Sequence, residues 1–517
     1  MSAEDTLLGW FARSVRDHAD AVALEVGDHA LTYGELDRCA AALAARVLRE
    51  HGRAPRRVGL LANRSPVAFA GYLAALRLGA AVVPINPGHP APRNALIVEA
   101  ASFDVLLVDG SGTPPPGTGE ATVLRLTDDD VLDHDGAEPP EHRADLDDVA
   151  YVLFTSGSTG RPKGVPITHR AASAYVGHNV RRYELGPGCR TSHTFDLTFD
   201  PSVFDLFATW GGGATLVCPQ RAELLTPVDY LVERGITHWF SVPSVVSVGA
   251  DLGNLPTGLA TGVRYSVFIG EQLTLRRAAA WRAVAPRSVI DNVYGPTELT
   301  VACTEYRLPA DPGAWPATSN DTVPIGDVYP WLDHVVLDED GLPALDGELC
   351  VRGVQRFGGY VDPRDNRGRF VAEDGIRFAP VPDGADVEGS HYYRTGDRVR
   401  VENGDLVHLG RLDHQVKVRG YRIELGEIET VLARHPDVVD AVVLAVRTDE
   451  EVRLDAFFSG TPVPDKQLVR WTRARLPLHM VPRRFHHVDA LPLNANGKTD
   501  RGALLGRLMT PDVPAEN

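Results

Sequence analysis

Apolar positions along the chain follow helical spacing in some stretches and strand-like spacing in others. Thr32-Tyr-Gly-Glu35 has the spacing of a capping box, and Leu36, Ala40, Leu43 and Val47 then recur on one helical face. A helix is predicted there. Short apolar runs at 58–61 and 105–108, bounded by turn formers, predict buried parallel strands between helices. This alternation indicates an α/β fold.

The pattern changes twice further along the chain. Two stretches rich in Pro, Gly and acidic residues, 110–148 and 309–324, predict irregular surface segments. Later apolar runs predict a β-rich part and then a small α+β unit after Gly410. They comprise strands at 348–351 and 406–409, a helix at 425–433, an apolar run at 438–446 and a basic helix near Arg470. We therefore expect a large N-terminal domain of mixed sheets flanked by helices with a β-rich part, and a small α+β C-terminal domain.

Size and charge narrow the class of protein. A chain of 517 residues is too long for one ordinary core. A net charge of −17 argues against broad binding of nucleic acid, and the apolar runs are too short for a membrane anchor. The acidic start of the chain does not resemble a secretory signal, and the five cysteines form no CxxC pair. We expect a cytoplasmic protein with reduced cysteines.

A candidate phosphate loop follows a predicted strand at 151–154. It reads Thr155-Ser-Gly-Ser-Thr-Gly-Arg-Pro-Lys163. Glycines allow backbone N–H groups to approach phosphate oxygens, hydroxyls add donors, and lysine supplies positive charge. The loop is not a Walker A motif, because Pro162 precedes Lys163 and Gly164 follows it. The alternative is a flexible Gly/Ser surface turn. The predicted ATP-phosphate residues are Thr155, Ser156, Gly157, Ser158, Thr159, Gly160 and Lys163.

These residues resemble the signature loop of adenylate-forming enzymes of the nonribosomal peptide synthetase adenylation-domain type. The resemblance extends over nearly the whole chain and rests on several motifs in the family's order. The further matches are Leu78-Gly-Ala-Ala-Val-Val-Pro-Ile-Asn-Pro87, Asn292-Val-Tyr-Gly-Pro-Thr-Glu298, Gly347-Glu-Leu-Cys-Val-Arg-Gly353, Tyr393-Arg-Thr-Gly-Asp397, the run from Gly410 to Glu429, and Asn496-Gly-Lys-Thr-Asp-Arg501.

The resemblance implies roles for residues outside the loop, with ATP and Mg²⁺ as cofactors. Tyr294 would face adenine, Thr297 the α-phosphate, and Glu298 the Mg²⁺ that bridges the phosphates. Asp397 would accept both ribose hydroxyls beside Arg411. Without the family match, Glu298 would be interpreted as a solvated turn residue and Asp397 as a loop cap.

The resemblance also assigns parts to the two domains. Residues 1–412 would form the core that binds ATP and the amino acid. Residues 413–517 would form a mobile lid whose Lys498 stabilises charge as pyrophosphate leaves. Lys163 would act with it in catalysis. Asp413 resembles the hinge about which the lid turns, so that the segment 417–420 serves thioester formation after Lys498 has served adenylation.

The activated acid is predicted from an aspartate that would bind an amine. The pairs Phe195-Asp196 and Phe199-Asp200 make Asp196 and Asp200 candidates, and Asp200 is favoured by its distance to the turn at 211–216 and by Pro201 at the start of a helix. Simple helix capping is the alternative role for Asp200. The family register gives pocket walls with no charge, which predict a small neutral amino acid, alanine first. They are Pro201, Phe204, Ser241, Val267, Ile269, Val293, Val301 and Ala302.

The thiol acceptor is expected on a separate carrier protein with a phosphopantetheine arm. The sequence ends soon after Arg501 and has no Gly-Gly-x-Ser attachment site of its own. Whether the substrate is an α- or a β-amino acid stays open, since a shifted aspartate could serve either. The rival classes are an acyl- or aryl-CoA ligase of the same superfamily and a catalytically silent nucleotide-binding module.

Overall fold

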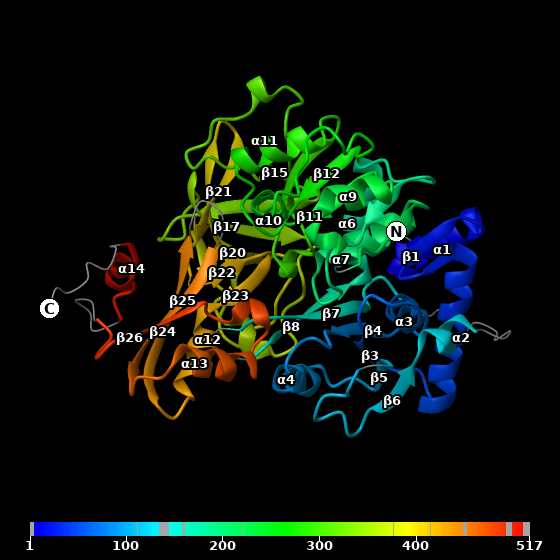
Figure 1. Cartoon of the computed structure of the whole chain (residues 1–517), viewed down its shortest axis with the longest axis horizontal. Coiled ribbons are helices and arrows are strands. Elements are labelled where there is room, and N and C mark those ends of the chain that lie inside the picture. The colour runs from blue at the N-terminus through cyan, green and yellow to red at the C-terminus, as the bar shows by residue number, and fades with distance from the viewer. Residues whose placement is uncertain are drawn as a thin grey trace. The chain divides into compact units, whose positions relative to one another are not determined.

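The computed structural model describes residues 5–110, 112–133, 144–157, 161–220, 222–375, 377–413, 415–447, 452–492 and 499–509. The chain falls into two compact units. The first comprises Met1–Pro87, Ile97–Phe154 and Lys163–Leu412, and the second comprises Gly88–Leu96, Thr155–Pro162 and Asp413–Asn517. The mixed α/β architecture, with a large N-terminal and a small C-terminal part, confirms the predicted fold class (Figure 1).

The first unit contains a nine-stranded sheet whose inner strands are parallel. Pairs β1–β10, β10–β9, β9–β11, β11–β12 and β12–β13 are parallel, while β2, β14 and β15 add antiparallel edges. In spatial order the strands are β15 (Asp327–Val328), β14 (Thr304–Arg307), β13 (Val289–Tyr294), β12 (Tyr265–Phe268), β11 (His238–Ser241), β9 (Arg190–Ser192), β10 (Thr215–Val217), β1 (Val22–Val26) and β2 (His29–Thr32).

A second sheet of the same unit carries the phosphate loop at the end of one strand. Its order is β6 (Thr122–Leu126), β5 (Val105–Asp109), β3 (Arg57–Leu61), β4 (Ala81–Ile85), β7 (Val149–Thr155) and β8 (Lys163–Thr168). The predicted strands at 58–61 and 105–108 are neighbours in parallel pairing, as expected. Because the strands are buried, their apolar runs are continuous rather than alternating.

Helices cover these sheets, and the caps read from the sequence begin several of them. Thr32 forms the predicted capping box with Glu35 at the start of α2. Figure 1 shows α3 beside β3 and β4. The helices are α1 (Leu7–His18), α2 (Tyr33–His51), α3 (Pro66–Arg77), α4 (Ala91–Ala101), α5 (Asp128–Leu132), α6 (His169–Arg182), α7 (Pro201–Val203), α8 (Thr209–Gly211), α9 (Pro227–Glu233), α10 (Ser244–Asp251) and α11 (Leu275–Val284).

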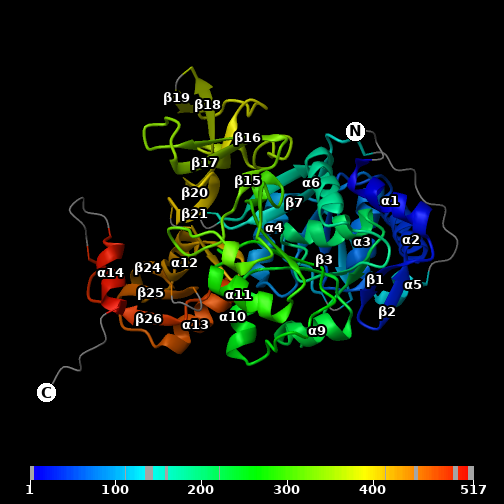
Figure 2. The ribbon, with the colours of Figure 1, turned by 90° about the horizontal axis from the view of Figure 1, so that it is seen from above.

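The β-rich part of the first unit forms a third sheet, gathered in one place in Figure 2. It contains β16 (Leu332–Leu337), β17 (Asp346–Gly353), β20 (Tyr392–Glu402), β18 (Phe370–Asp374) and β19 (Arg377–Pro380), with β21 (Asp405–Arg411) on β20. The second unit has its own apolar core. Its elements are β22 (Gln415–Val418), β23 (Tyr421–Glu424), α12 (Leu425–Ala433), β24 (Val438–Arg447), β25 (Val452–Gly460), α13 (Asp465–Arg473), β26 (Arg484–His487) and α14 (Arg501–Met509).

The prediction that residues 110–148 form an irregular segment is wrong in part. Strand β6 and helix α5 lie within it, and Leu124, Leu126 and Val131 are buried. The acidic run at 128–130 occupies the first turn of α5, where negative charge is favourable to the helix dipole, and Thr127 caps that turn. Among the described residues, no helix is both long enough and apolar enough to cross a membrane.

Candidate functional site

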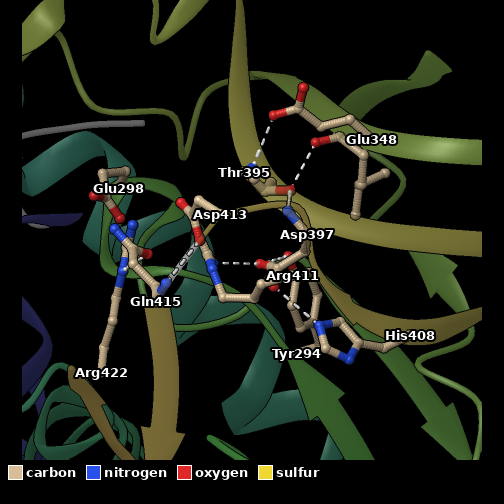
Figure 3. Close-up of polar contacts among 12 residues, drawn as sticks. Tyr294, Glu298, Glu348, Thr395, Asp397, His408, Arg411, Asp413, Gln415 and Arg422 are labelled. Carbon is tan, nitrogen blue, oxygen red and sulfur yellow. Dashed lines mark hydrogen bonds and ion pairs between the residues drawn. The ribbon is translucent and has the colours of Figure 1, made fainter. Parts of the chain in front are cut away.

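A buried carboxylate is held by three side chains in the first unit (Figure 3). Asp397 on β20 lies opposite Arg411 on β21, and Tyr294 ends β13. The Tyr294 hydroxyl donates to Asp397 Oδ2 at 2.7 Å, and an Arg411 guanidinium N–H donates to the same oxygen at 3.1 Å. His408 Nε2 lies 2.9 Å from Oδ1. The structure thus brings together the three residues predicted around adenine and ribose.

Burial sets the electrostatics of this cluster. Asp397 is 1% exposed. Burial, and next to it the Asp397 carboxylate, raises the pKa of Tyr294 well above its usual value, so the hydroxyl stays a hydrogen-bond donor. The Asp397 backbone N–H donates to Thr395 Oγ1 at 3.0 Å, which fixes the residue from the main-chain side. A preorganised double acceptor of this kind suits a vicinal diol.

A second cluster joins the predicted metal residue to the loop lysine. The Tyr360 hydroxyl donates to Glu298 Oε1 at 2.6 Å, and Glu298 is fully buried. Lys163 Nζ lies 5.6 Å from the Tyr360 ring centroid and 3.6 Å from Asp365 Oδ1. Burial raises the pKa of Asp365, and the Lys163 ammonium opposes that shift. Tyr360 thus contacts the Lys163 cation through its ring and the Glu298 carboxylate through its hydroxyl.

The sequence interpretation missed the partners His408, Tyr360 and Asp365. Each makes its contact across a tertiary register that no short motif encodes. His408 reaches Asp397 because β20 and β21 pair, and Tyr360 reaches Glu298 over 62 residues of chain. The resemblance predicted the residues that would bind nucleotide and metal. It did not predict the side chains that form hydrogen bonds or ion pairs with those residues.

The donor set fits ATP with Mg²⁺. The described part of the chain holds no group of three or more His, Cys, Asp or Glu that could bind a metal by itself. Mg²⁺ is commonly held by one or two carboxylates together with substrate phosphates, which is the chemistry that Glu298 offers. Thr297 begins the short 3-10 turn that carries Glu298. Position 295, which precedes this turn, requires glycine, because a Cβ there would lie 2.6 Å from the Ala302 Cα.

The first residues of the phosphate loop belong to the second compact unit. Thr155 ends β7, and the Ser156 hydroxyl donates to the Arg422 carbonyl at 2.8 Å and accepts from the Glu424 N–H at 3.2 Å. Gly157 belongs to the same unit. Asp413 begins the main segment of this unit, and its Oδ1 accepts from the Gln415 N–H at 3.1 Å. Ser158, Thr159, Gly160 and Lys498 lie outside the described residues.

The two candidate amine-binding aspartates differ in their surroundings. Asp196 accepts from the Asn86 amide at 3.0 Å and from the Thr198 N–H and hydroxyl, so it organises its own loop. Asp200 occupies the N-cap position of α7, but its side chain makes no capping bond to that helix. Burial, then Tyr72 and Asp200, raises the pKa of Tyr151 on β7 well above its usual value, so the Asp200 carboxylate acts electrostatically on a residue of that strand. Helix capping therefore does not explain Asp200.

Helix α7 continues through a π-helical turn, Phe204–Ala208, into α8. Inside that turn Asp205 is fully buried and lies 3.1 Å from His193 Nδ1. The Phe195 backbone N–H also points to Asp205, at 3.4 Å. The turn therefore anchors the loop that carries both candidate aspartates. π-Helical turns are frequent at functional sites.

The predicted pocket walls are all buried. Ser241, Val267 and Val293 lie at or near the carboxyl ends of β11, β12 and β13, and Ile269 follows β12. Ligands of open parallel sheets bind outside the carboxyl ends of the strands. Pro201 opens α7, and Phe204, Val301 and Ala302 belong to the same apolar cluster as Val267, Ile269 and Val293. Those predicted walls that belong to or follow these strands therefore lie toward one edge of the sheet.

Comparison with protein families covers both units. The family model described as AMP-binding enzyme matches residues 11–361, and the AMP-binding enzyme C-terminal domain matches residues 427–498. The phosphinothricin tripeptide synthetase PhsC of Streptomyces viridochromogenes is 38% identical over 96% of this chain. The chain spans less than half the length of such curated relatives, 45% in the case of PhsC.

Solved structures are similar over nearly the whole chain. The crystal structure of IdnL7 is 39% identical with a TM-score of 0.71, and the match covers 98% of this chain and 99% of IdnL7. The Vibrio cholerae adenylation domain AlmE, in complex with glycyl-adenosine-5'-phosphate, is 25% identical with a TM-score of 0.81 and 97% coverage of both chains. NpsA-ThdA, an artificially fused adenylation–PCP di-domain from Klebsiella oxytoca, is 25% identical with a TM-score of 0.79 and 93% coverage of both. The chain therefore belongs to the AMP-binding enzyme family, the adenylate-forming enzymes that include the adenylation domains of nonribosomal peptide synthetases.

Proposed function

We propose that this enzyme activates a small neutral amino acid, alanine first, as its aminoacyl-adenylate with ATP and Mg²⁺. The observation that carries the proposal is a carboxylate, Asp200, at the start of a helix whose next turn contributes apolar walls. An ammonium group needs such a carboxylate, whereas aryl and fatty acids do not. The glycyl-adenosine-5'-phosphate complex of AlmE supports an adenylate of a small amino acid.

The proposed chemistry is a displacement at the α-phosphorus. The carboxylate of the amino acid forms the new bond to phosphorus, and the bond to the leaving pyrophosphate breaks. Asp397 would hold the ribose hydroxyls and Tyr294 the adenine face. Glu298 would hold Mg²⁺, and Lys163 would face phosphate oxygens together with Thr155–Gly157 and Ser158–Gly160. Lys498 would neutralise charge that builds as pyrophosphate leaves, which is the reason for its catalytic role.

The size of the acid follows from the walls. Val267, Val293 and Val301 are branched and buried, so a longer side chain would have to displace them. Ser241 adds a hydroxyl, and it already donates to the Val242 carbonyl at 3.3 Å. Alanine therefore fits best, with glycine, serine, proline and valine next. A difference of one methylene in such a pocket changes kcat/KM by roughly 10–200-fold.

Amino-acid-dependent exchange of pyrophosphate into ATP tests the substrate class. A panel of the common amino acids and several β-amino acids is expected to give the highest kcat/KM with alanine. A higher value for a β-amino acid would support the alternative that a β-amino acid is activated. Thioester formation from an amine-free acid and coenzyme A, without exchange by any amino acid, would instead make the enzyme an acyl- or aryl-CoA ligase.

We further propose that the aminoacyl group passes to the phosphopantetheine thiol of a separate carrier protein. The thiolate would attack the acyl carbon, and AMP would leave with the bonding electrons. The artificially fused adenylation–PCP di-domain NpsA-ThdA supports a carrier protein as the partner class. Residues 1–412 would bind ATP and the amino acid, and residues 413–517 would turn about Asp413 between the two half-reactions.

Asp413→Pro is expected to preserve pyrophosphate exchange and to abolish carrier loading. Proline fixes φ near −65°, so the backbone torsion at residue 413 could no longer absorb the turn. Loading is measured as intact mass of the carrier protein after incubation with amino acid and ATP. Asp413→Ala, which leaves φ unrestricted, should retain both activities. Equal loss of both activities in Asp413→Pro would contradict the hinge role.

A further inference from the structure

The loop that supplies two pocket walls has a strained backbone. Thr300 and Val301 both adopt positive φ, 59° and 70°, although neither is glycine. The Ala302 N–H donates to the Thr300 carbonyl at 2.9 Å, which closes a tight γ-turn centred on Val301. A β-branched residue at positive φ is an outlier, and such turns are rare. The surrounding structure must therefore hold this loop.

One buried side chain holds it. Gln355 is fully buried, and its amide Nε2 donates to the carbonyls of Leu299, Thr300 and Ala302 at 3.1, 3.2 and 2.8 Å. The Thr300 hydroxyl donates to the Gln355 carbonyl at 2.7 Å. Gln355 thus holds the γ-turn by hydrogen bonds to backbone carbonyls on both sides of Val301.

Another side chain fixes the orientation of the Gln355 side-chain amide. The Trp331 indole N–H donates to Gln355 Oε1 at 2.7 Å, which fixes which end of the amide faces the loop. The neighbouring Phe357 N–H donates to the Glu298 carbonyl at 2.9 Å, so the same segment also holds the backbone that precedes the turn. On the opposite side Gly295 leaves room for the loop, since a Cβ there would lie 2.7 Å from the Val301 carbonyl oxygen.

We propose that Gln355 is a specificity-determining positioning residue that sets the size of the amino-acid pocket by holding Val301 and Ala302 in the strained turn. Gln355 touches no substrate and acts through these two walls. The inference rests on the proposed function, since it assigns Val301 and Ala302 to the side-chain pocket. Released from Gln355, the turn relaxes to negative φ and the two walls move.

Gln355→Met tests this role, because methionine keeps the length of the side chain and removes its donors. The readout is the ratio of kcat/KM for alanine to kcat/KM for 2-aminobutyrate, which is larger by one methylene. We expect this ratio to fall by about 10-fold, the lower limit of discrimination for one methylene. A partly unfolded preparation lowers both values equally and leaves the ratio unchanged.

Two further variants separate positioning from stability. Trp331→Phe removes the indole donor to Gln355 Oε1 and leaves Gln355 and both walls unsubstituted, so it should lower the ratio in the same direction and by less. It also provides the readout if Gln355→Met fails to fold. Asn179→Ala removes another buried amide, which donates to the Tyr175 carbonyl at 2.8 Å within α6, and should leave the ratio unchanged.

An unchanged ratio in both Gln355→Met and Trp331→Phe would overturn the positioning role while the proposed function stands. A parent enzyme that shows exchange with no amino acid would overturn the proposed function and this inference with it. A fall of the ratio in Asn179→Ala equal to that in Gln355→Met would also contradict the inference, because any loss of a buried amide would then suffice.

Discussion

Asp200→Ala is expected to cause a large loss of kcat/KM for the amino acid in pyrophosphate exchange. The substrate ammonium would enter an apolar pocket without its carboxylate partner, and leaving one member of a buried charge pair costs about 2–5 kcal/mol, roughly 30- to 5,000-fold in kcat/KM. The loss should appear mainly in KM for the amino acid. The measurement is exchange kinetics at saturating ATP, with ATP binding followed by calorimetry.

The chain offers a matched control four residues away. Asp196 belongs to the preceding Phe-Asp pair, and its carboxylate is engaged by Asn86 and Thr198. Asp196→Ala should lower thermal stability and leave the dependence on an amino acid in place. If Asp196→Ala abolished exchange and Asp200→Ala preserved it, the assignment of the amine-binding aspartate would have to be exchanged.

Asp397→Asn is expected to lower kcat/KM for ATP by about 100-fold, with a smaller change in KM for the amino acid. Asparagine presents one acceptor oxygen where aspartate presents two, and its amide N–H₂ would face either the ribose or Arg411. Two weakened charge-assisted hydrogen bonds at about 1.5 kcal/mol each account for the loss. Exchange kinetics with varied ATP measure it.

Nucleotide analogues show whether Asp397 binds the ribose. The parent enzyme should discriminate against 2′-deoxy-ATP, and Asp397→Asn should erase most of that discrimination. Tyr294→Phe is the matched control, since it removes the 2.7 Å hydrogen bond to Asp397 and retains the aromatic ring. It should cost only a few-fold, in the range of one hydrogen bond. Equal discrimination by parent and Asp397→Asn would exclude the ribose contact.

Local signals in the sequence predicted much of the fold. The capping box at Thr32 and Glu35 marks the start of α2, and continuous apolar runs mark β3 and β5. Helix α5 was not predicted, because its acidic run was interpreted as solvated surface. Thr127 caps that run and makes it the first turn of a helix. Composition alone does not distinguish a loop from a capped turn.

The candidate site was predicted unevenly for a related reason. Motifs and register located Tyr294, Asp397 and Arg411, which the structure brings together. They did not locate His408 or Gln355, whose contacts depend on strand pairing and on a backbone conformation that follows no local propensity. The positive φ of Val301 is imposed by its neighbours, so it cannot be read from the residue itself.

The π-helical turn at Phe204–Ala208 bears on how relatives of this enzyme could change substrate. A π-turn is geometrically an α-helix with one added residue, so gain or loss of a single codon there shifts the upstream chain by about 100° around the helix axis without unwinding it. Asp200 lies one α-helical turn upstream. Insertion and deletion at this point therefore offer evolution a route to move the proposed amine-binding carboxylate while the downstream helix stays packed.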